Sequence, residues 1–441
     1  MLFDLGWCDA LNGLPAILGS SINESTEIKR LSVMMLDIFK TYKVKDITNV
    51  QVPVELYFFF NKIKEILLKE ISDFTYWDLS NSFKEKYRES TTFGISGNEE
   101  NISIGELTAF LKSVVTKVEK GLEKAFNKES GVYYTYFINE AKEYMLTKDK
   151  DKNGLPFVRI LKFEQRPIPY FLEGPVHVLR MAKDIEKARK LHNSIKNTGL
   201  YDEKLDMFKV NANIMEETKE IGRQNVFPRG WLENEAIFLH MEYKYFLELL
   251  RVGLYDEFFQ SFNNAFIPFL DPEIYGRSIL ENSSFIASSV HIDDKIHGTG
   301  FVSRLTGASA EFLNIWRYMT VGKIPFFIND NNQLCLEFKP VIPGWLFTDV
   351  AKEITTFKNM IEEKVQLPEN IFAFNLLGSI FTIYHNETKK NTFGPDCAVI
   401  NYIELFKDGN LIITIKGSTI SAPYAEQVRD GIINKIEIYF R

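Results

Sequence analysis

The sequence predicts a mainly α-helical chain that ends in a small β domain. From about residue 20 to 325, apolar residues recur every three or four positions, which is the period of an amphipathic helix. After "KPVIPGW" the pattern changes to short β-branched and aromatic runs that are separated by turns such as "KDGN". Helices followed by strands predict an α domain over residues 1–328 and a β domain over residues 329–441.

The helical pattern is clearest in "SIGELTAFLKSVVTKVEKGLEKAF", residues 103–126. Ser103 and Glu106 have the spacing of a capping box, in which each side chain accepts a hydrogen bond from the backbone N–H of the other residue at the start of a helix. The same period predicts further helices over 28–41, 54–70, 173–196, 236–252 and 308–320. In the last part, "NIFAFNLLGSIFTIYHN", "AVINYIELF", "GNLIITIKGSTI" and "NKIEIYF" predict an antiparallel sheet or sandwich.

Composition excludes several classes of protein. With 441 residues, 45% of them hydrophobic and 14% aromatic, the chain is expected to fold around a large core. The net charge of −7 argues against nucleic acid or an anionic membrane as the main partner. The N-terminus has no basic region before its apolar part, and no run of about 18 uncharged apolar residues follows, so we expect a cytoplasmic protein without a membrane span.

No metal or cofactor is expected. The cysteines, Cys8, Cys335 and Cys397, are too few and too scattered for a disulfide framework or a thiolate zinc site. His291 and His297 flank two aspartates, but their spacing is better explained by a surface loop.

Three positions are candidates for chemistry, although each also has a structural explanation. Asp9 in "GWCDALNGLP" has the setting of a turn or cap residue. His240 follows "LENEAIFL" in an apolar helix, where a core histidine would also fit. Ser309 lies in "TGASAEFLNIW", a helix start whose free N–H groups suit an anion such as phosphate, or which is an ordinary N-cap.

Taken in this order, "WCDALN", "ENEAIFLH" and "TGASAEFLNIW" resemble motifs in the C-terminal half of the cellobiose phosphorylase family, whose relatives act on chitobiose and β-glucans. The resemblance covers residues 1 to about 330, and the β domain also has a counterpart. It implies that residues 1–328 are part of an (α/α)6-barrel catalytic domain and that residues 329–441 form a C-terminal β-sandwich. A homodimer is expected only by analogy with the family.

The resemblance assigns roles to particular residues. Asp9 would be the general acid, and Trp7 would stack on the sugar at the reacting subsite. Glu233 and Asn234 would bind sugar hydroxyls. His240 and Ser309 would bind inorganic phosphate, which is a co-substrate and not a cofactor.

The implied reaction is the reversible, inverting phosphorolysis of a β-linked glucose oligosaccharide to α-glucose 1-phosphate. Phosphate is already an anion, so the enzyme needs no second carboxylate to activate a nucleophile, whereas an inverting glycosidase does. One alternative is therefore an inverting β-glycosidase in which Glu235 or Glu281 is the base. The other is a non-catalytic carbohydrate-binding or structural subunit.

The chain also departs from the family pattern. Gly6 and Leu232 stand where the family usually has aspartate and lysine, and Ser309 replaces threonine. Because the family's acid lies well inside its barrel, the resemblance implies a fragment or one subunit of a split enzyme, completed by an N-terminal partner chain.

Overall fold

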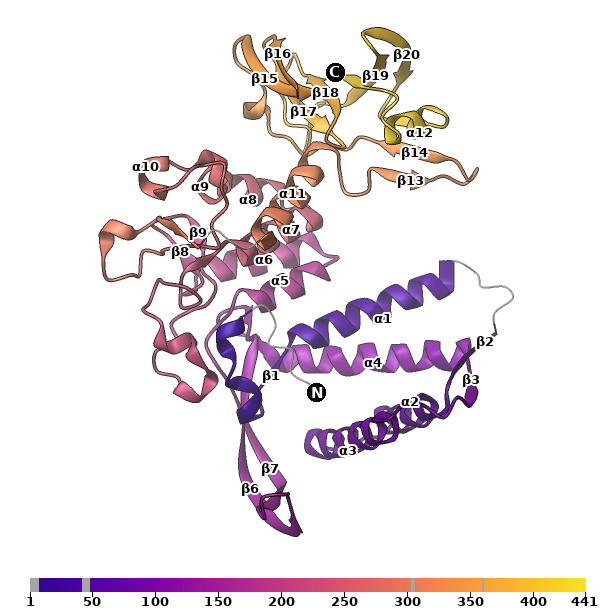
Figure 1. Cartoon of the computed structure of the whole chain (residues 1–441), viewed down its shortest axis with the longest axis vertical. Coiled ribbons are helices and arrows are strands. Elements are labelled where there is room, and N and C mark those ends of the chain that lie inside the picture. Colours follow the sequence, from indigo (N-terminus) through magenta and orange to yellow (C-terminus); the bar gives the residue numbers. More distant parts are fainter. Residues whose placement is uncertain (1–7, 42–47, 303–305, 359–360) are drawn as a thin grey trace. The chain divides into compact units, whose positions relative to one another are not determined.

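The computed structural model describes residues 8–41, 48–302, 306–358 and 361–441 (Figure 1). Its contacts divide the described chain into two compact units. The first unit contains residues 8–248 and 264–302, and the second contains residues 249–263 and 306–441. The boundary predicted at 328/329 falls within the second unit, at the end of a strand that covers Phe326–Ile328.

The prediction of a mainly α chain forming part of an (α/α)6 barrel is wrong. The structure is 39% helical and 26% strand, and its strands form many small sheets. The largest difference lies in the region expected to be helical, where residues 136–167 form a long β-hairpin. Apolar residues three or four apart can also occur in strands, so the periodicity was not sufficient to exclude sheets there.

Some helices of the first unit lie over stretches that local signals predicted, but α3 (Asp73–Thr91) was not among those predicted. The capping box of Ser103 and Glu106 is present and opens the helix Ile104–Ala125, which confirms that prediction. The stretch predicted as one helix over 173–196 is instead two helices, with a break at residues 181–184. The helices are α1 Asn23–Thr41, α2 Val54–Leu67, α3 Asp73–Thr91, α4 Ile104–Ala125, α5 Glu173–Arg180, α6 Ile185–Lys196 and α10 Pro272–Tyr275. Two more, α7 Leu239–Val252 and α9 Phe262–Ala265, contain residues of both units.

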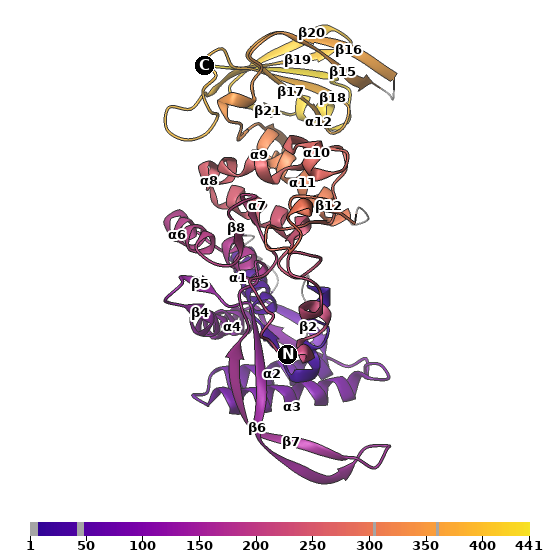
Figure 2. The same cartoon turned by 90° about the vertical axis from the view of Figure 1, so that its left-hand side faces the viewer.

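The strands of the first unit are short, apart from one hairpin. Those outside it are β1 Ser20–Ser21, β2 Asn49–Pro53, β3 Glu99–Ser103, β4 Phe126–Asn127, β5 Val132–Tyr133, β8 Tyr201–Asp202, β9 Met207–Phe208, β10 Ile237–Phe238, β11 Phe285–Ile286 and β12 Gly300–Phe301. In the hairpin, β6 Tyr136–Lys150 pairs with β7 Pro156–Pro167, and both strands project from the helices of the unit (Figures 1 and 2). Near its base, Phe163 packs edge-on against Trp77 of α3, with 4.7 Å between ring centroids.

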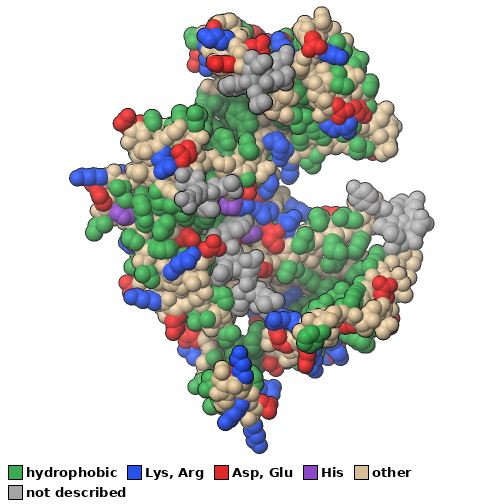
Figure 3. Space-filling view, in the orientation of Figure 1, with side chains coloured by type: hydrophobic (Ala, Val, Ile, Leu, Met, Phe, Trp, Pro, Cys, Tyr) green, Lys and Arg blue, Asp and Glu red, His purple; other side chains and the backbone are tan. Residues whose placement is uncertain are grey.

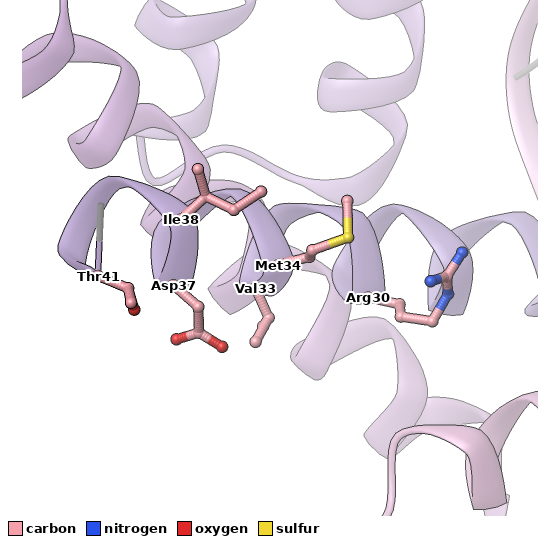
Figure 4. A pocket seen from close by; sticks show the side chains of 6 residues that line it. All are labelled: Arg30, Val33, Met34, Asp37, Ile38 and Thr41. Atoms are coloured by element: carbon pink, nitrogen blue, oxygen red, sulfur yellow. The ribbon is translucent and has the colours of Figure 1, made fainter. Parts of the chain in front are cut away.

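Helix α1 packs along α4 but leaves one apolar face in contact with solvent. Ile28, Leu31, Met35 and Ile38 are between 38% and 44% exposed, and Figure 3 shows hydrophobic side chains at the surface over this helix. A shallow, open pocket of about 320 Å³ lies beside this face (Figure 4). All six of its lining residues come from α1 itself: Arg30, Val33, Met34, Asp37, Ile38 and Thr41.

The second unit contains the strands expected near the C-terminus. A five-stranded sheet has the order β17-β18-β22-β19-β20, and a three-stranded sheet has the order β13-β14-β21. Both sheets contribute to one core, to which Leu336, Ile420, Ile403 and Ile436 belong. The elements are α8 Tyr255–Gln260, α11 Thr306–Thr320, α12 Tyr424–Arg429, β13 Phe326–Ile328, β14 Leu334–Glu337, β15 Lys352–Lys358, β16 Ile361–Leu367, β17 Ile371–Leu376, β18 Ile380–His385, β19 Ile400–Lys407, β20 Asn410–Lys416, β21 Thr419–Ser421 and β22 Lys435–Phe440.

The ionised carboxylate of Glu437 on β22 stabilises the second unit, and this stabilisation is lost at acid pH. Hydrogen bonds from His385 (3.1 Å), Lys435 and Tyr439 outweigh the effect of burial and lower the pKa of Glu437 to about 2 from an ordinary 4.5. A lowered carboxyl pKa stabilises the fold above the ordinary pKa, and this contribution is lost as the pH falls through the folded value. Glu437→Gln should therefore reduce the urea midpoint at pH 7, and the difference from the unsubstituted protein should shrink between about pH 4.5 and pH 2. If the two proteins differed in urea midpoint by the same amount at pH 7 and at pH 2, the lowered pKa of Glu437 would be contradicted.

Candidate functional site

Asp9 is presented between two buried neighbours. It opens a short 3-10 helix, Asp9–Leu11, and its side chain is exposed, whereas Cys8 and Ala10 are fully buried. The chain around Asp9 is therefore buried, and the acid itself is not. Trp7, the predicted sugar platform, lies outside the described residues.

The structure brings Asp9 and Glu233 together. The backbone N–H of Ala10 donates to Oε2 of Glu233 at 2.8 Å, although the two residues are 223 positions apart. Burial raises the pKa of the Glu233 carboxyl, and the nearby charge of Asp9 raises it further, against the lowering effects of the Ala10 hydrogen bond and of Arg223. Two residues predicted from separate motifs thus share one electrostatic environment.

Glycines allow the Asp9 segment to approach residues 220–222 closely. A Cβ on Gly13 would lie 2.0 Å from the carbonyl oxygen of Glu220. Gly222 has a φ of +129°, and a Cβ there would lie 2.4 Å from the carbonyl oxygen of Ala10. A backbone hydrogen bond from the N–H of Gly13 to the carbonyl oxygen of Ile221 (3.1 Å) joins the same segments. The glycines in "LNGLP" and "EIGRQN" are therefore needed for close backbone contact around the Asp9 segment.

Asn234 and Glu235 stabilise the loop that carries Glu233. The buried amide of Asn234 donates to the carbonyl oxygen of Phe227 at 2.7 Å, so this N–H group points into the loop. Glu235 is also buried and accepts from Lys209 (3.2 Å) and Arg229 (3.1 Å). These contacts give both residues a structural explanation that does not involve sugar.

Aromatic rings connect the Glu233 loop with the start of α7. Ring stacking runs from Trp231 to Phe301 (3.7 Å between centroids), then to Phe285 (5.5 Å) and Phe238 (4.8 Å). The three phenylalanines are cross-strand neighbours in the sheet β10-β11-β12. The next ring is His240, which meets Phe238 edge-on at 6.0 Å. The stacked rings therefore connect three separate stretches of sequence, around residues 231–240, 285 and 301.

The two predicted phosphate ligands belong to different units. His240 is partly exposed in the first turn of α7, within the first unit. Ser309 is exposed in the first turn of α11, within the second unit. The contacts within the first unit therefore relate His240 to the Glu233 loop, and they do not include Ser309.

A buried polar network around Glu173 was not predicted from the sequence. Tyr136 of β6 donates to Oε2 of Glu173 at 2.5 Å, and both side chains are 1% exposed. His177 lies one turn further along α5 and approaches the other Glu173 oxygen at 3.8 Å. A local signal was present, because Glu173 stands in the apolar run "YFLEGPVHVL", where an unpaired carboxylate would be costly.

Both residues predicted as alternative bases form ion pairs in the structure. Glu235 is held by Lys209 and Arg229, as described above, and Glu281 pairs with Arg277 at 2.8 Å.

Within the described ranges, no group of three or more His, Cys, Asp and Glu side chains is arranged to hold a metal ion. The helices that the structure describes include none that is long and apolar enough to span a membrane. No protein-family model matches the chain, and neither does any curated protein.

Proposed function

We propose that the chain is a glycoside phosphorylase that cleaves a β-linked glucose oligosaccharide with inorganic phosphate and releases α-glucose 1-phosphate with inversion. The observation that carries the proposal is the hydrogen bond from Ala10 to Glu233, because it joins the predicted acid segment to the predicted sugar-binding loop. The proposal rests on these residues and not on a barrel fold. Three free cysteines also suit a reducing compartment, and we propose that the protein acts in the cytoplasm.

In this reaction Asp9 donates its proton to the glycosidic oxygen as the bond from that oxygen to the anomeric carbon breaks. A phosphate oxygen forms the new bond to the anomeric carbon from the opposite face. Exposure of Asp9 lets it regain a proton from solvent or from the phosphate after each turnover. Glu233 accepts hydrogen bonds from sugar hydroxyls with the oxygen that Ala10 does not occupy.

Phosphate is supported over water as the nucleophile. An inverting glycosidase needs a carboxylate free to activate water, and the two candidate bases are both engaged with arginine. His240 supplies a partly exposed imidazole at the start of a helix, where an anion is favoured. The phosphate-binding role of Ser309 remains a prediction from the sequence.

The proposal is tested by mixing the purified chain with α-glucose 1-phosphate and a panel of β-linked glucose acceptors while phosphate release is followed. We expect release with at least one acceptor and, in the opposite direction, no cleavage of the product unless phosphate is present. Cleavage without phosphate would support the glycosidase instead. No release from a folded chain that still binds the sugars would contradict the proposal and favour a non-catalytic carbohydrate-binding protein.

His240→Ala tests the phosphate site separately. Loss of one hydrogen bond to a charged ligand should raise the KM for phosphate about tenfold or more, with a smaller change in the KM for the sugar acceptor. His297→Ala is the matched control, since the described contacts of His297 lie away from His240: its Nδ1 accepts from Lys204, and its Nε2 donates to the carbonyl oxygen of His291. Equal KM values for phosphate in the two variants would remove His240 from the site.

A further inference from the structure

A third stretch of chain, residues 221–224, lies against the segment that contains the predicted acid. The N–H of Gly13 donates to the carbonyl oxygen of Ile221 at 3.1 Å. The N–H of Arg223 donates in the opposite direction, to Oδ1 of Asn12 at 3.2 Å. Two hydrogen bonds therefore join stretches whose members Asn12 and Arg223 are 211 positions apart along the chain.

The same stretch reaches the predicted sugar-binding loop through Gln224. Nε2 of Gln224 donates to the backbone carbonyl oxygen of Glu233, and the Gln224 side chain belongs to a residue that is fully buried. A carbonyl oxygen only accepts hydrogen bonds, so the amide must turn its NH₂ end, and not its oxygen, towards Glu233. This contact fixes the main chain of Glu233.

The hydrogen bonds form a closed arrangement of three segments. Oε2 of Glu233 accepts from the N–H of Ala10 at 2.8 Å, which joins the sugar-binding loop to the acid segment. Residues 221–224 are bonded to both of these segments, as described above. Glu233 is thus restrained twice, at one carboxylate oxygen by Ala10 and at its carbonyl oxygen by Gln224.

We infer that Gln224 is a positioning residue for Glu233, which it holds so that one carboxylate oxygen stays on Ala10 and the other faces the sugar. This role rests on the proposed function, in which Glu233 binds sugar hydroxyls. Because Gln224 is fully buried, it acts through Glu233 and not by touching the sugar. Hydrogen bonds weaken steeply with poor geometry, so a small displacement of Glu233 should weaken sugar binding.

The chain offers a matched pair of variants. Gln224→Met keeps the length of the side chain and removes its amide. Asn225→Leu is the control, because Asn225 is the next residue and is also buried, but its amide donates to the carbonyl oxygens of Glu217 (3.0 Å) and Thr218 (3.2 Å). Both variants lose a buried amide from neighbouring positions, and only Gln224→Met loses the hydrogen bond to Glu233.

The kinetic test separates sugar binding from phosphate binding. Gln224→Met should raise the KM for the oligosaccharide about tenfold and leave the KM for phosphate within about twofold, whereas Asn225→Leu should change neither. When Gln224→Met is added to Glu233→Ala, we expect no further rise in the KM for the oligosaccharide, because the residue through which Gln224 acts has lost its carboxylate. A further tenfold rise in the double variant would contradict the inference.

Hydrogen exchange tests the contact without relying on enzyme activity. The N–H of Ala10 reports directly on the carboxylate of Glu233, since it donates to that group. Exchange resolved to single amides should be about tenfold faster at Ala10 in Gln224→Met than in the unsubstituted protein, and unchanged in Asn225→Leu. The N–H of Gly13 serves as the internal reference and should keep its rate in both variants.

The two measurements distinguish the possible failures. An unchanged Ala10 exchange rate in folded Gln224→Met protein would overturn the inference, as would equal increases in Gln224→Met and Asn225→Leu. If the unsubstituted chain cleaves no oligosaccharide with phosphate, the proposed function fails. The exchange rates then still decide whether Gln224 holds Glu233 against the acid segment.

Discussion

Asp9→Asn is expected to lower the rate of phosphate release by about 10²- to 10⁴-fold, the usual contribution of a positioned general acid. The amide has nearly the same shape as the carboxyl but cannot transfer a proton to the glycosidic oxygen. Asp9 is exposed, so the substitution should leave the fold intact. Asp37→Asn, at another exposed aspartate of the same unit, is the matched control and should retain full activity.

A substrate that needs no proton makes this test specific. In a β-glucoside of dinitrophenol, the dinitrophenolate group leaves without being protonated. The Asp9→Asn variant should therefore cleave this substrate with phosphate at a rate close to that of the unsubstituted protein. Equal losses on both substrates would show that Asp9 has a structural role and is not the acid. Full release from ordinary oligosaccharides in the variant would remove Asp9 from the mechanism.

Glu235→Gln is expected to reduce the free energy of unfolding by about 3–5 kcal/mol, because it leaves a buried lysine without its carboxylate. Lys209 is only 4% exposed, and Glu235 accepts from its ammonium group at 3.2 Å. Arg229, the second partner, is 42% exposed at its side chain and can turn to water. The loss should therefore come mainly from Lys209, and urea unfolding of the two proteins measures it.

Glu281→Gln is the matched control for this substitution. Its partner is Arg277, and both side chains are partly exposed, so the cost should stay below about 1 kcal/mol. Replacing both members of the buried pair, as Lys209→Met with Glu235→Leu, should recover much of the lost stability, since apolar residues of similar size need no charged partner. Similar costs for Glu235→Gln and Glu281→Gln would contradict a structural role for the buried pair.

Local sequence signals predicted several elements correctly. The helices α1, α2 and α4 lie over the predicted stretches, and the capping box of Ser103 and Glu106 marks the start of α4. The C-terminal strands also follow the alternating runs and turns of the sequence. These features depend on neighbours within a few residues, which is the range over which hydrophobic period and capping act.

The hairpin β6–β7 shows where such reasoning fails. Its register places Tyr144 opposite Ile160 and Leu146 opposite Val158, which gives the strands a shared apolar face. Each strand alone also contains apolar residues at helical spacing, and only pairing across the turn near Gly154 selects the extended form. The predicted barrel was wrong because it assumed helices in this region.

By itself, the sequence determined which residues were available for chemistry. These are Asp9 between apolar neighbours, Glu233 ahead of the helix that contains His240, and glycines at turns. Tertiary structure alone decided that Ala10 meets Glu233, that Lys209 neutralises Glu235, and that Tyr136 donates to Glu173. Hydrogen bonds and desolvation depend on distance in space, and residues 223 positions apart along a chain carry no local pattern that reveals their contact.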